Sequence, residues 1–388
     1  MKQDKDLSIY IHYPFCLSKC PYCDFNSYKL TAINQVDFLN AYLLEIENYY
    51  NLLKNREIKT IFFGGGTPSI MSIDFASKII NKINDLWGIG NIEISMEANP
   101  TTVEIGKFCD FNKIGINRLS IGIQSLNDDW LKFFGRMHNK AEAIKAIEIA
   151  QKIFDKRYSI DLIYARPKQK INDWLNELEE AVKLSPYHIS LYQLIIEEGT
   201  KFFEIGIKTL GDKKASEMYN ITNDFLENKN INIYEVSNYA KSGFECRHNL
   251  NYWDNGEWMG VGAGAHGRVC FGDDFVDGYK IRTSVENYKS PQKWIDSVLQ
   301  TGFGCEIKED LTKEEFIEEV LLMGLRLRGG IKLENVKKYL IVDSVKDIVS
   351  DSYNGLVKDD LVVVNNGALK VNVKYFNVLD SIIEKLMK

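Results

Sequence analysis

Three of the seven cysteines in this chain lie close together near its start, as Cys16, Cys20 and Cys23. They follow an alternating apolar stretch, Leu7 to Tyr13, which predicts a β-strand and puts the thiols on the loop at its carboxyl end. Open α/β folds place their chemistry at that end. Thiolates favour iron–sulfur clusters and zinc, and both usually take four protein ligands. No nearby Cys or His supplies a fourth, so a cubane held by three thiolates, with one iron open to an outside ligand, fits this spacing best. A partial zinc site or unrelated core cysteines are the alternatives.

Composition narrows the class of protein. The chain has 388 residues, 26% charged residues and a net charge of −6, so a basic surface for nucleic acid is not expected. The cysteine count is odd and three cysteines share one loop, which argues against a disulfide framework and for a reducing compartment. The polar N-terminus and the lack of a long apolar run predict a cytoplasmic protein whose membrane contacts are peripheral.

Short β-branched runs alternate with helical periodicity, which is the pattern of βα units around a parallel sheet. The expected strands are Leu7–Tyr13, Lys59–Phe63, Ile92–Glu97, Ile116–Ile121, Tyr158–Ile163 and His188–Gln193. Helices are expected near 35–54, 74–87, 102–113, 140–154 and 172–184. The prediction is an α/β fold with a partial, TIM-like (β/α)6 barrel that is open on one side.

Two further regions follow the predicted barrel of residues 1–240. Residues 241–305 are expected to form a connection of glycine- and aromatic-rich loops. Residues 306–388 are expected to form a small α+β domain of winged-helix type, with a hairpin turning at Asn365-Asn366-Gly367 and a terminal helix Val378–Met387. Because this domain is acidic, a lid or interaction role is preferred to DNA binding.

Polar residues recur where the predicted strands end. Gly64, Gly65, Gly66 and Thr67 follow the second strand, and glycines there let a ligand approach the backbone N–H groups. Glu93, Ser95 and Glu97 alternate onto one face of the third strand, and carboxylates in a sheet interior are costly unless they meet a polar ligand. Glu97 is therefore a candidate binding residue, whereas Glu93 is expected to reach solvent.

The cysteine spacing, with Tyr22 just before the last cysteine, resembles the radical S-adenosylmethionine (SAM) superfamily, and the whole chain resembles its HemN/HemW branch. The resemblance implies a [4Fe-4S] cluster on Cys16, Cys20 and Cys23, whose open iron takes the amino and carboxylate groups of SAM. The residues that fall where this branch contacts SAM are Tyr10, Tyr22, Gly65, Gly66, Thr67, Glu97, Gln124, Arg136 and Asp161. One departure is Ala165-Arg166, where relatives usually carry Gly-Leu, and it bears on the shape of the loop after Asp161.

Two functions within this branch differ at a few positions. The oxygen-independent coproporphyrinogen III dehydrogenase carries a further cysteine where this chain has Phe25, and it has an N-terminal extension. The haem chaperone of the branch carries an H-N-x-x-Y-W signature, which His248, Asn249, Tyr252 and Trp253 match. An imidazole suits axial iron ligation, and flat aromatic rings pack on a macrocycle.

The sequence thus predicts a haem chaperone that binds haem, SAM and a [4Fe-4S] cluster. The resemblance implies membrane-bound respiratory haem proteins as clients, with peripheral contact at the inner membrane. The alternatives are the dehydrogenase and, at lower weight, a zinc-containing interaction protein. Whether the chain acts as an enzyme stays open at this point. The glycine-rich stretch 259–267 is not expected to bind a nucleotide, because no strand was expected before it.

Overall fold

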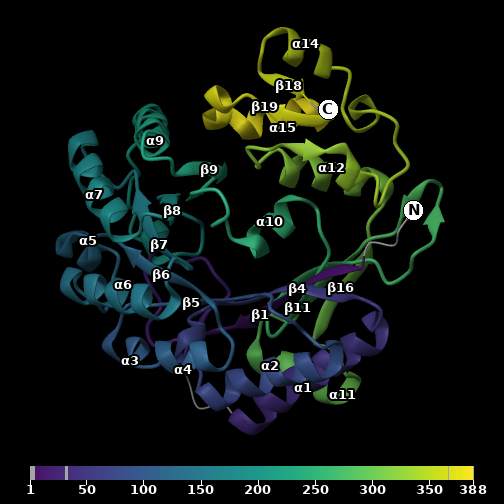
Figure 1. Ribbon diagram of the computed structural model, residues 1–388, viewed down its shortest axis with the longest axis horizontal. Helices are drawn as coiled ribbons and strands as arrows, with labels where there is room; N and C mark the ends of the chain where they lie inside the picture. Colours follow the sequence, from purple (N-terminus) through teal and green to yellow (C-terminus); the bar gives the residue numbers. More distant parts are fainter. Residues whose placement is uncertain (1–4, 31–33, 366, 388) are drawn as a thin grey trace.

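A computed structural model describes residues 5–30, 34–365 and 367–387. Six parallel strands lie where the sequence predicted them, and they are neighbours in one sheet. They are β1 (Asp6–Tyr13), β4 (Glu57–Gly65), β5 (Glu93–Ala98), β6 (Arg118–Gln124), β7 (Tyr158–Tyr164) and β8 (His188–Gln193). The partial barrel is confirmed, and the sheet curves into an open arch (Figure 1).

Helices cover the convex face of this arch (Figure 1). Buried apolar side chains such as Ile9, Ile61 and Leu119 point toward them from alternate strand positions. The outer helices are α1 (Gln35–Leu53), α2 (Ile73–Trp87), α3 (Thr102–Ile105), α4 (Phe108–Lys113), α5 (Asp128–Phe133), α6 (Lys140–Phe154), α7 (Ile171–Leu184) and α9 (Asp212–Glu227). The single helix expected over 102–113 is two short helices, with Gly106 in the break between them.

The region 241–305 differs from the expected connection of loops. It contributes β11 (Trp258–Val261), β12 (His266–Val269) and β15 (Thr283–Asn287), which with β16 (Cys305–Asp310) extend the sheet beyond β1. β11 runs parallel to β1 and directly precedes Gly262, so the glycine-rich stretch does have a preceding strand. The chain then returns as antiparallel β12 and not as a helix, so a dinucleotide-binding turn is still not formed.

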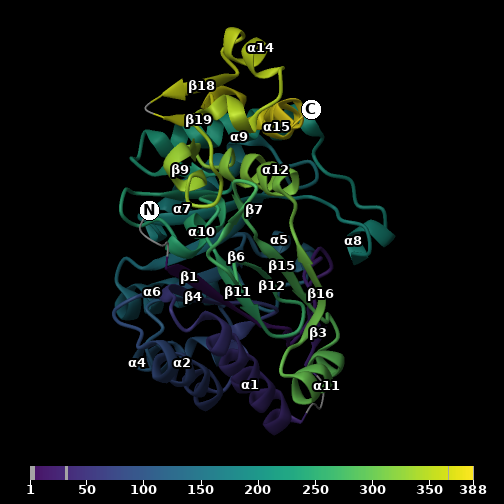
Figure 2. The ribbon, with the colours of Figure 1, turned by 90° about the vertical axis from the view of Figure 1, so that its right-hand side faces the viewer.

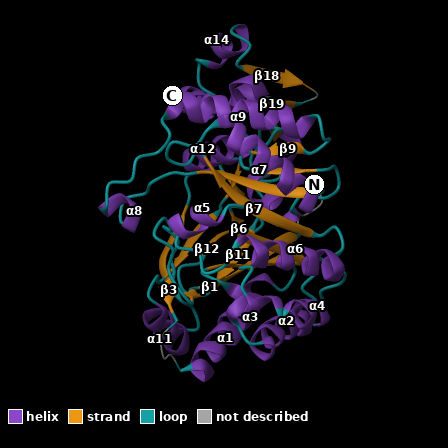
Figure 3. Cartoon of the chain, turned by 90° about the vertical axis from the view of Figure 1, so that its left-hand side faces the viewer, coloured by secondary structure: helices purple, strands orange, loops and turns teal. Residues whose placement is uncertain are grey.

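Three more pieces complete the main sheet and its surroundings. β9 (Asn232–Glu235) and β10 (Asn238–Ala240) form the edge beyond β8, and α11 (Pro291–Thr301) packs on α1. α10 (Arg247–Trp253) lies on the concave side of the arch (Figure 1). α8 (Lys201–Glu204) sits on a loop that projects from the body (Figures 2 and 3). β13 (Phe275–Val276) and β14 (Tyr279–Lys280) form a separate small hairpin.

A smaller α+β domain follows β16 (Figure 2). It contains α12 (Lys313–Gly324), β17 (Ile331–Lys332), α13 (Leu333–Val336), α14 (Tyr353–Lys358), β18 (Val362–Asn365), β19 (Ala368–Val371) and α15 (Leu379–Met387). The expected β18–β19 hairpin and terminal helix are present, and β17 joins them as a third strand. Asn366, in the hairpin turn, lies outside the described residues. Among the described residues, no helix is both long and apolar enough to cross a membrane.

Glu45 of α1 fastens the added strands to the barrel. Its buried carboxylate accepts hydrogen bonds from the N–H groups of Gly262 and Gly304 and from the side chains of Asn287 and Trp294, at 2.8–3.1 Å. Burial raises the pKa of this carboxyl to about 7, although all four donors oppose that shift. One side chain of α1 therefore holds three separate segments of the region 262–304.

A Glu45→Ala variant is expected to lose about 3 kcal/mol of unfolding free energy, because four buried donors lose their acceptor. Denaturant unfolding measures this loss. Glu47→Ala on the same helix is the control, since Glu47 makes a surface ion pair with Lys82 and its loss should cost less than about 1 kcal/mol. Equal losses in the two variants would show that Glu45 is not a structural anchor.

Candidate functional site

The cysteine loop leaves the carboxyl end of β1 and is held by short local contacts. β2 (Phe15–Cys16) pairs in parallel with β3 (Tyr28–Lys29), and the Cys23 N–H donates to the carbonyl of Cys20 at 3.1 Å. These contacts bend the loop so that all three thiols line one pocket of about 330 Å³. The loop thus gathers Cys16, Cys20 and Cys23 at the carboxyl edge of the sheet.

Each of the three sulfur atoms has a polar neighbour. The Thr67 hydroxyl donates to Cys16 Sγ at 3.3 Å, and Arg136 Nη1 donates to Cys20 Sγ at 3.4 Å. Ser27 Oγ lies 3.9 Å from Cys23 Sγ. Burial raises the pKa values of Cys16 and Cys23 above the usual range of a thiol, so both are protonated until a metal binds. The guanidinium and hydroxyl donors suit the thiolates that a cluster requires.

The donor set fits a cluster better than one zinc ion. The described residues include no group of three or more His, Cys, Asp or Glu side chains placed to hold a single metal ion. A cubane spreads its thiolate ligands over several iron atoms, so three sulfur atoms around one pocket can hold it. Cys16, Cys20 and Cys23 would hold such a cluster, which would supply iron to which a second small molecule can bind.

The pocket also collects side chains from the carboxyl ends of successive strands. Besides the cysteines, it is lined by seven of the nine residues that the resemblance assigns to SAM: Tyr22, Gly66, Thr67, Glu97, Gln124, Arg136 and Asp161. Gly65 lies beside it and donates its N–H to Glu97 Oε2 at 3.2 Å. Contact of these residues with SAM stays a prediction.

Of the carboxylates that line this pocket, Glu97 and Asp161 are half-buried, whereas Asp24 and Glu197 are exposed. Burial, followed by the negative charge of Asp161, raises the pKa of Glu97 to about 8. Burial also raises the pKa of Asp161 to about 6, although hydrogen bonds from Ser190 and Ser120 and the charge of Arg136 act in the opposite direction. Two carboxylates in one cavity repel each other, so a cationic ligand would favour the ionised form of both.

Arg136 is held in place by a residue that the sequence analysis missed. Its Nη2 donates to Gly122 O at 2.7 Å and to Asn99 Oδ1, and Asn99 Nδ2 donates to Thr67 Oγ1 at 3.1 Å. Asn99 lines the pocket just beyond the end of β5, two residues after Glu97. The signal that could have identified Asn99 is its position just after the strand that carries the candidate residue Glu97.

The loop after Asp161 contains the sequence departure Ala165-Arg166. Ala165 has φ +57°, in the left-handed region that favours glycine, which agrees with the Gly expected of relatives. Arg166 is buried, forms an ion pair with Glu177, and donates from Nη1 to Ser125 Oγ at 2.8 Å. Ala165 and Arg166 thus anchor this loop through contacts that lie outside the pocket.

Tyr10 lies deeper in the barrel than the other predicted SAM residues. Its hydroxyl donates to His12 Nδ1 at 3.0 Å, and His12 Nε2 donates to the Asn26 carbonyl at 2.9 Å. The ring of Tyr10 stacks on Phe62, with centroids 6.3 Å apart. Tyr10 does not line the cysteine pocket, so it supports the loop through His12 in this structure.

The predicted haem residues lie on α10, away from that pocket. His248 is 1% exposed and stacks on Phe62, with ring centroids 5.1 Å apart. Its Nδ1 donates to Thr60 Oγ1 at 2.7 Å, and its Nε2 accepts from the Tyr252 hydroxyl at 2.6 Å. Burial lowers the pKa of His248 to about 3, so the imidazole is neutral. Both ring nitrogens are occupied, so iron ligation by His248 would require α10 to move.

Asn249 and Trp253 lie on the same short helix, and Asn249 Oδ1 lies 3.4 Å from Cys246 Sγ. Neither lines the cysteine pocket.

Glu93, which was expected to reach solvent, is only 1% exposed. It accepts the His248 N–H at 3.2 Å and faces Arg118 at 3.9 Å, so the burial of this charge is compensated. The expectation for Glu93 was wrong because α10 enters the barrel, and no local pattern in the sequence predicted this.

Asn26 ties the cysteine loop to the added strands. Its Nδ2 donates to the carbonyls of Ala263 and Lys289 at 3.1 and 3.0 Å, and its own carbonyl accepts from His12.

An Asn26→Ala variant should retain several-fold less iron after reconstitution, because Asn26 lies three residues from Cys23 and holds the cysteine loop in place. Residues that orient metal ligands typically cost 10–100-fold in metal affinity when they are removed. Iron and sulfide analysis measures this. Asn34→Ala, a helix-cap change outside the loop, is the control, and equal iron content in both variants would contradict the role of Asn26.

Comparison with known proteins gives consistent matches. The radical SAM superfamily model matches residues 10–181, and such a domain implies SAM and a [4Fe-4S] cluster. The chain is 42% identical over 350 residues to the heme chaperone HemW of Buchnera aphidicola subsp. Schizaphis graminum, covering 89% of this chain and 91% of that protein. It is 39% identical over 269 residues to the heme chaperone HemW of Escherichia coli, covering 69% and 71%.

A solved structure shares the complete fold. Coproporphyrinogen III oxidase (HemN) from Escherichia coli matches with a TM-score of 0.80 and 20% identity, covering 99% of this chain and 91% of that chain. The two HemW proteins match most of the chain in sequence, and the structural neighbour shares its fold. The chain therefore belongs to the HemW family of radical SAM proteins.

Proposed function

We propose that this chain is a haem chaperone, which binds haem next to a SAM-coordinating [4Fe-4S] cluster and delivers it to membrane-bound respiratory haem proteins. The observation that carries the proposal is the three-thiol pocket, with the half-buried carboxylates of Glu97 and Asp161 on its wall, in a chain 42% identical to a protein named as a heme chaperone. Delivery would take place on the cytoplasmic side, with peripheral contact at the membrane.

The chain's own residues have separate tasks in this proposal. Cys16, Cys20 and Cys23 would hold the cluster, and Arg136 would stabilise the thiolate of Cys20. Glu97 and Asp161 would face the positive charges of SAM, because their carboxylates lie in the same pocket. His248 would ligate haem iron after α10 moves, and Tyr252 and Trp253 would pack against the macrocycle.

The second candidate is radical decarboxylation of coproporphyrinogen III, which the likeness of fold to HemN favours. Phe25, whose side chain is 57% exposed, stands where that enzyme is expected to carry a further cysteine. Phe25 disfavours the dehydrogenase, since an aromatic ring supplies neither a ligand nor a proton there.

One experiment separates the two functions. The full chain, reconstituted anaerobically with iron and sulfide, is mixed with SAM and either haem or coproporphyrinogen III. We expect a haem absorption spectrum that saturates at one haem per chain, and no conversion of coproporphyrinogen. Turnover of the porphyrinogen without haem binding would replace the chaperone by the dehydrogenase. Absence of both activities would reject both proposals.

Binding of SAM should be pH-dependent. The pKa of Glu97 is raised to about 8 and that of Asp161 to about 6, so at neutral pH Glu97 is mostly protonated and Asp161 mostly ionised, and a cationic sulfonium favours loss of the Glu97 proton. Affinity should therefore rise from pH 6 to pH 8, by up to about tenfold per pH unit as Glu97 ionises, with a smaller contribution from Asp161 near pH 6. Titration calorimetry across this range measures the rise. In Glu97→Gln the upper part of the rise should vanish, and an unchanged pH profile in that variant would contradict the assignment.

A further inference from the structure

The side chain of Asn99 joins two residues of the cysteine pocket. Asn99 follows β5 directly, lines the pocket and is half-buried. Its amide carries donors on Nδ2 and an acceptor on Oδ1, and the two ends contact different partners. Nδ2 donates to Thr67 Oγ1 at 3.1 Å, and Oδ1 accepts from Arg136 Nη2. One amide thus connects the segment after β4 with the segment after α5.

Both partners of Asn99 also contact a cysteine sulfur. The Thr67 hydroxyl donates to Cys16 Sγ at 3.3 Å, and Arg136 Nη1 donates to Cys20 Sγ at 3.4 Å. A hydroxyl has one hydrogen, and Thr67 can give it to sulfur because toward Asn99 its oxygen acts only as an acceptor. Asn99 therefore directs two donors toward two of the three sulfur atoms that would hold the cluster.

The backbone of Asn99 is itself fixed by a buried carboxylate. Its N–H donates to Glu104 Oε2 at 2.8 Å, and Glu104 is 1% exposed. The same carboxylate accepts hydrogen bonds from the hydroxyl groups of Ser69 and Thr101. Asn99 thus starts from a fixed position, which is what a residue needs in order to orient its neighbours.

Hydrogen bonds to the sulfur ligands change the reduction potential of an iron–sulfur cluster. The reduced cluster carries one more negative charge than the oxidised cluster, so an N–H or O–H donor stabilises the reduced form more and raises the potential. A carboxylate at position 99 would offer acceptors alone. The Thr67 hydroxyl would then turn its hydrogen from Cys16 to that carboxylate, and the potential would fall.

We propose that Asn99 is a positioning residue that sets the reduction potential of the [4Fe-4S] cluster, by directing the donors of Thr67 and Arg136 onto two of its thiolates. This inference rests on the part of the proposed function that places a cluster on the three cysteines. It is independent of whether the chain carries haem or converts coproporphyrinogen. The potential decides which reductants can reduce the cluster, so Asn99 acts on the site through its two neighbours.

The test is a redox titration of the cluster-loaded full chain without SAM or haem, followed by the electron paramagnetic resonance signal of the reduced cluster. Asn99→Asp keeps the shape of the side chain, removes the donor to Thr67 and adds a negative charge. We expect the reduction equilibrium to fall at least about tenfold, which is about 59 mV for a one-electron couple. Iron and sulfide analysis and thermal unfolding show that the variant holds its cluster and is folded.

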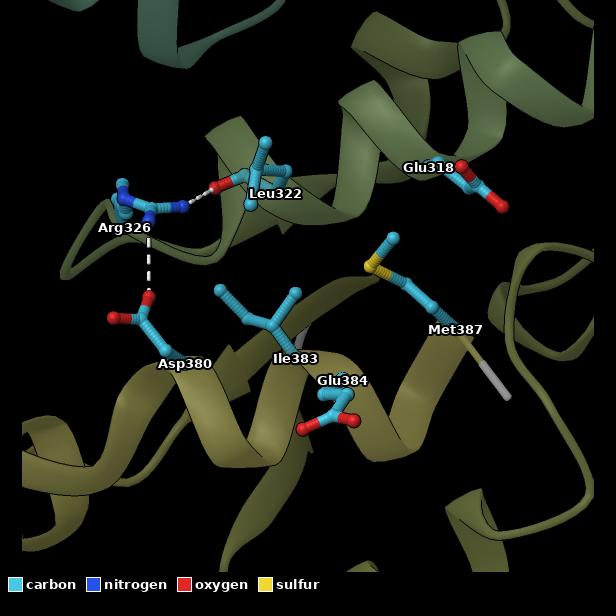
Figure 4. Close-up of a pocket in the computed structure, with 7 residues that line it drawn as sticks. All are labelled: Glu318, Leu322, Arg326, Asp380, Ile383, Glu384 and Met387. Carbon is cyan, nitrogen blue, oxygen red and sulfur yellow. Dashed lines mark hydrogen bonds and ion pairs between the residues drawn. The ribbon is translucent and has the colours of Figure 1, made fainter.

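Two controls separate this effect from the added charge. Gln193→Glu makes the same change from amide to carboxylate on the wall of the same pocket, at the end of β8. Arg326→Gln lowers the net charge by the same one unit in the C-terminal domain. Figure 4 shows Arg326 beside Asp380, to which it donates at 2.9 Å, in a groove whose described lining residues are not those of the cysteine pocket. Each control should change the reduction equilibrium less than about twofold.

A double-variant cycle tests the connection through Thr67. Thr67→Val removes the donor to Cys16, and Asn99→Ala removes both contacts of the amide without adding charge. Asn99→Ala should lower the reduction equilibrium at least about threefold, and the double variant should shift it by less than the sum of the single shifts.

Additive shifts in the cycle, or an equilibrium within twofold of the wild type in both Asn99 variants, would overturn the inference while leaving the cluster in place. A wild-type chain that takes up no iron–sulfur cluster would instead reject the cluster of the proposed function, and this inference with it.

Discussion

A Cys20→Ala variant is expected to lose its [4Fe-4S] cluster and, with it, SAM binding. Among the residues that the structure describes, three thiols line the pocket, so removing one leaves two ligands for a cubane, and Arg136 loses the sulfur that it contacts at 3.4 Å. Iron and sulfide per chain should fall to less than about a tenth of the wild-type content, and the broad visible absorption of the cluster should vanish. Chemical iron and sulfide analysis after anaerobic reconstitution gives the measurement.

Cys109→Ala is the matched control. Cys109 is an exposed thiol on α4 and does not line the pocket, so this variant should keep its full cluster. Cys16→Ala and Cys23→Ala should behave as Cys20→Ala does. If the Cys20 variant keeps four iron atoms per chain, or if the wild-type chain binds a single zinc ion instead, the cluster assignment and the SAM site that depends on it are both wrong.

A His248→Gln variant is expected to lose at least about tenfold in haem affinity, because glutamine can keep a hydrogen bond to Thr60 but cannot replace an axial imidazole. Titration of the cluster-loaded chain with haem measures the dissociation constant, and thermal unfolding shows whether the variant is folded. Asn251→Ala, on the same helix, is the control. Unchanged haem affinity in His248→Gln would leave this histidine with a purely structural role.

Tyr252→Phe should have the opposite effect on haem affinity. The Tyr252 hydroxyl occupies His248 Nε2 at 2.6 Å, so its removal weakens the buried state of α10 while leaving the aromatic ring in place. A lost hydrogen bond of about 1 kcal/mol would raise the population of the open state, and hence the apparent affinity, about fivefold. Weaker haem binding in Tyr252→Phe would indicate that His248 binds without any movement of α10.

Much of the barrel could be predicted because its signals are local. Strands such as His188–Gln193 carry a short alternating pattern, with Ile189 and Leu191 on one face, and the structure places that strand within the same bounds. The convergence of Thr67, Glu97 and Asp161 also followed from local order, since parallel strands bring their carboxyl ends to one edge. The haem assignments on α10 and the domain boundaries stay predictions.

The strands β11, β12 and β15 were missed because they are short and two of them contain glycine, at Gly260 and Gly267. Nothing within such a segment distinguishes a strand from a loop. Their strand character comes from pairing with β1 and with one another, and from the Glu45 carboxylate that binds Gly262 and Gly304. Contacts between residues more than 200 positions apart leave no periodic trace in the sequence.

The sequence by itself determined the three thiols of the cysteine loop, the order of the barrel strands and the polar residues at their ends, because each depends on neighbours a few positions apart. Only the tertiary structure decided that α10 enters the barrel, that Glu93 and His248 are buried together, and that Asn26 joins the cysteine loop to Ala263 and Lys289. These features depend on which distant surfaces meet when the chain closes. Their free energy comes from burial and hydrogen bonds that exist only after that closure.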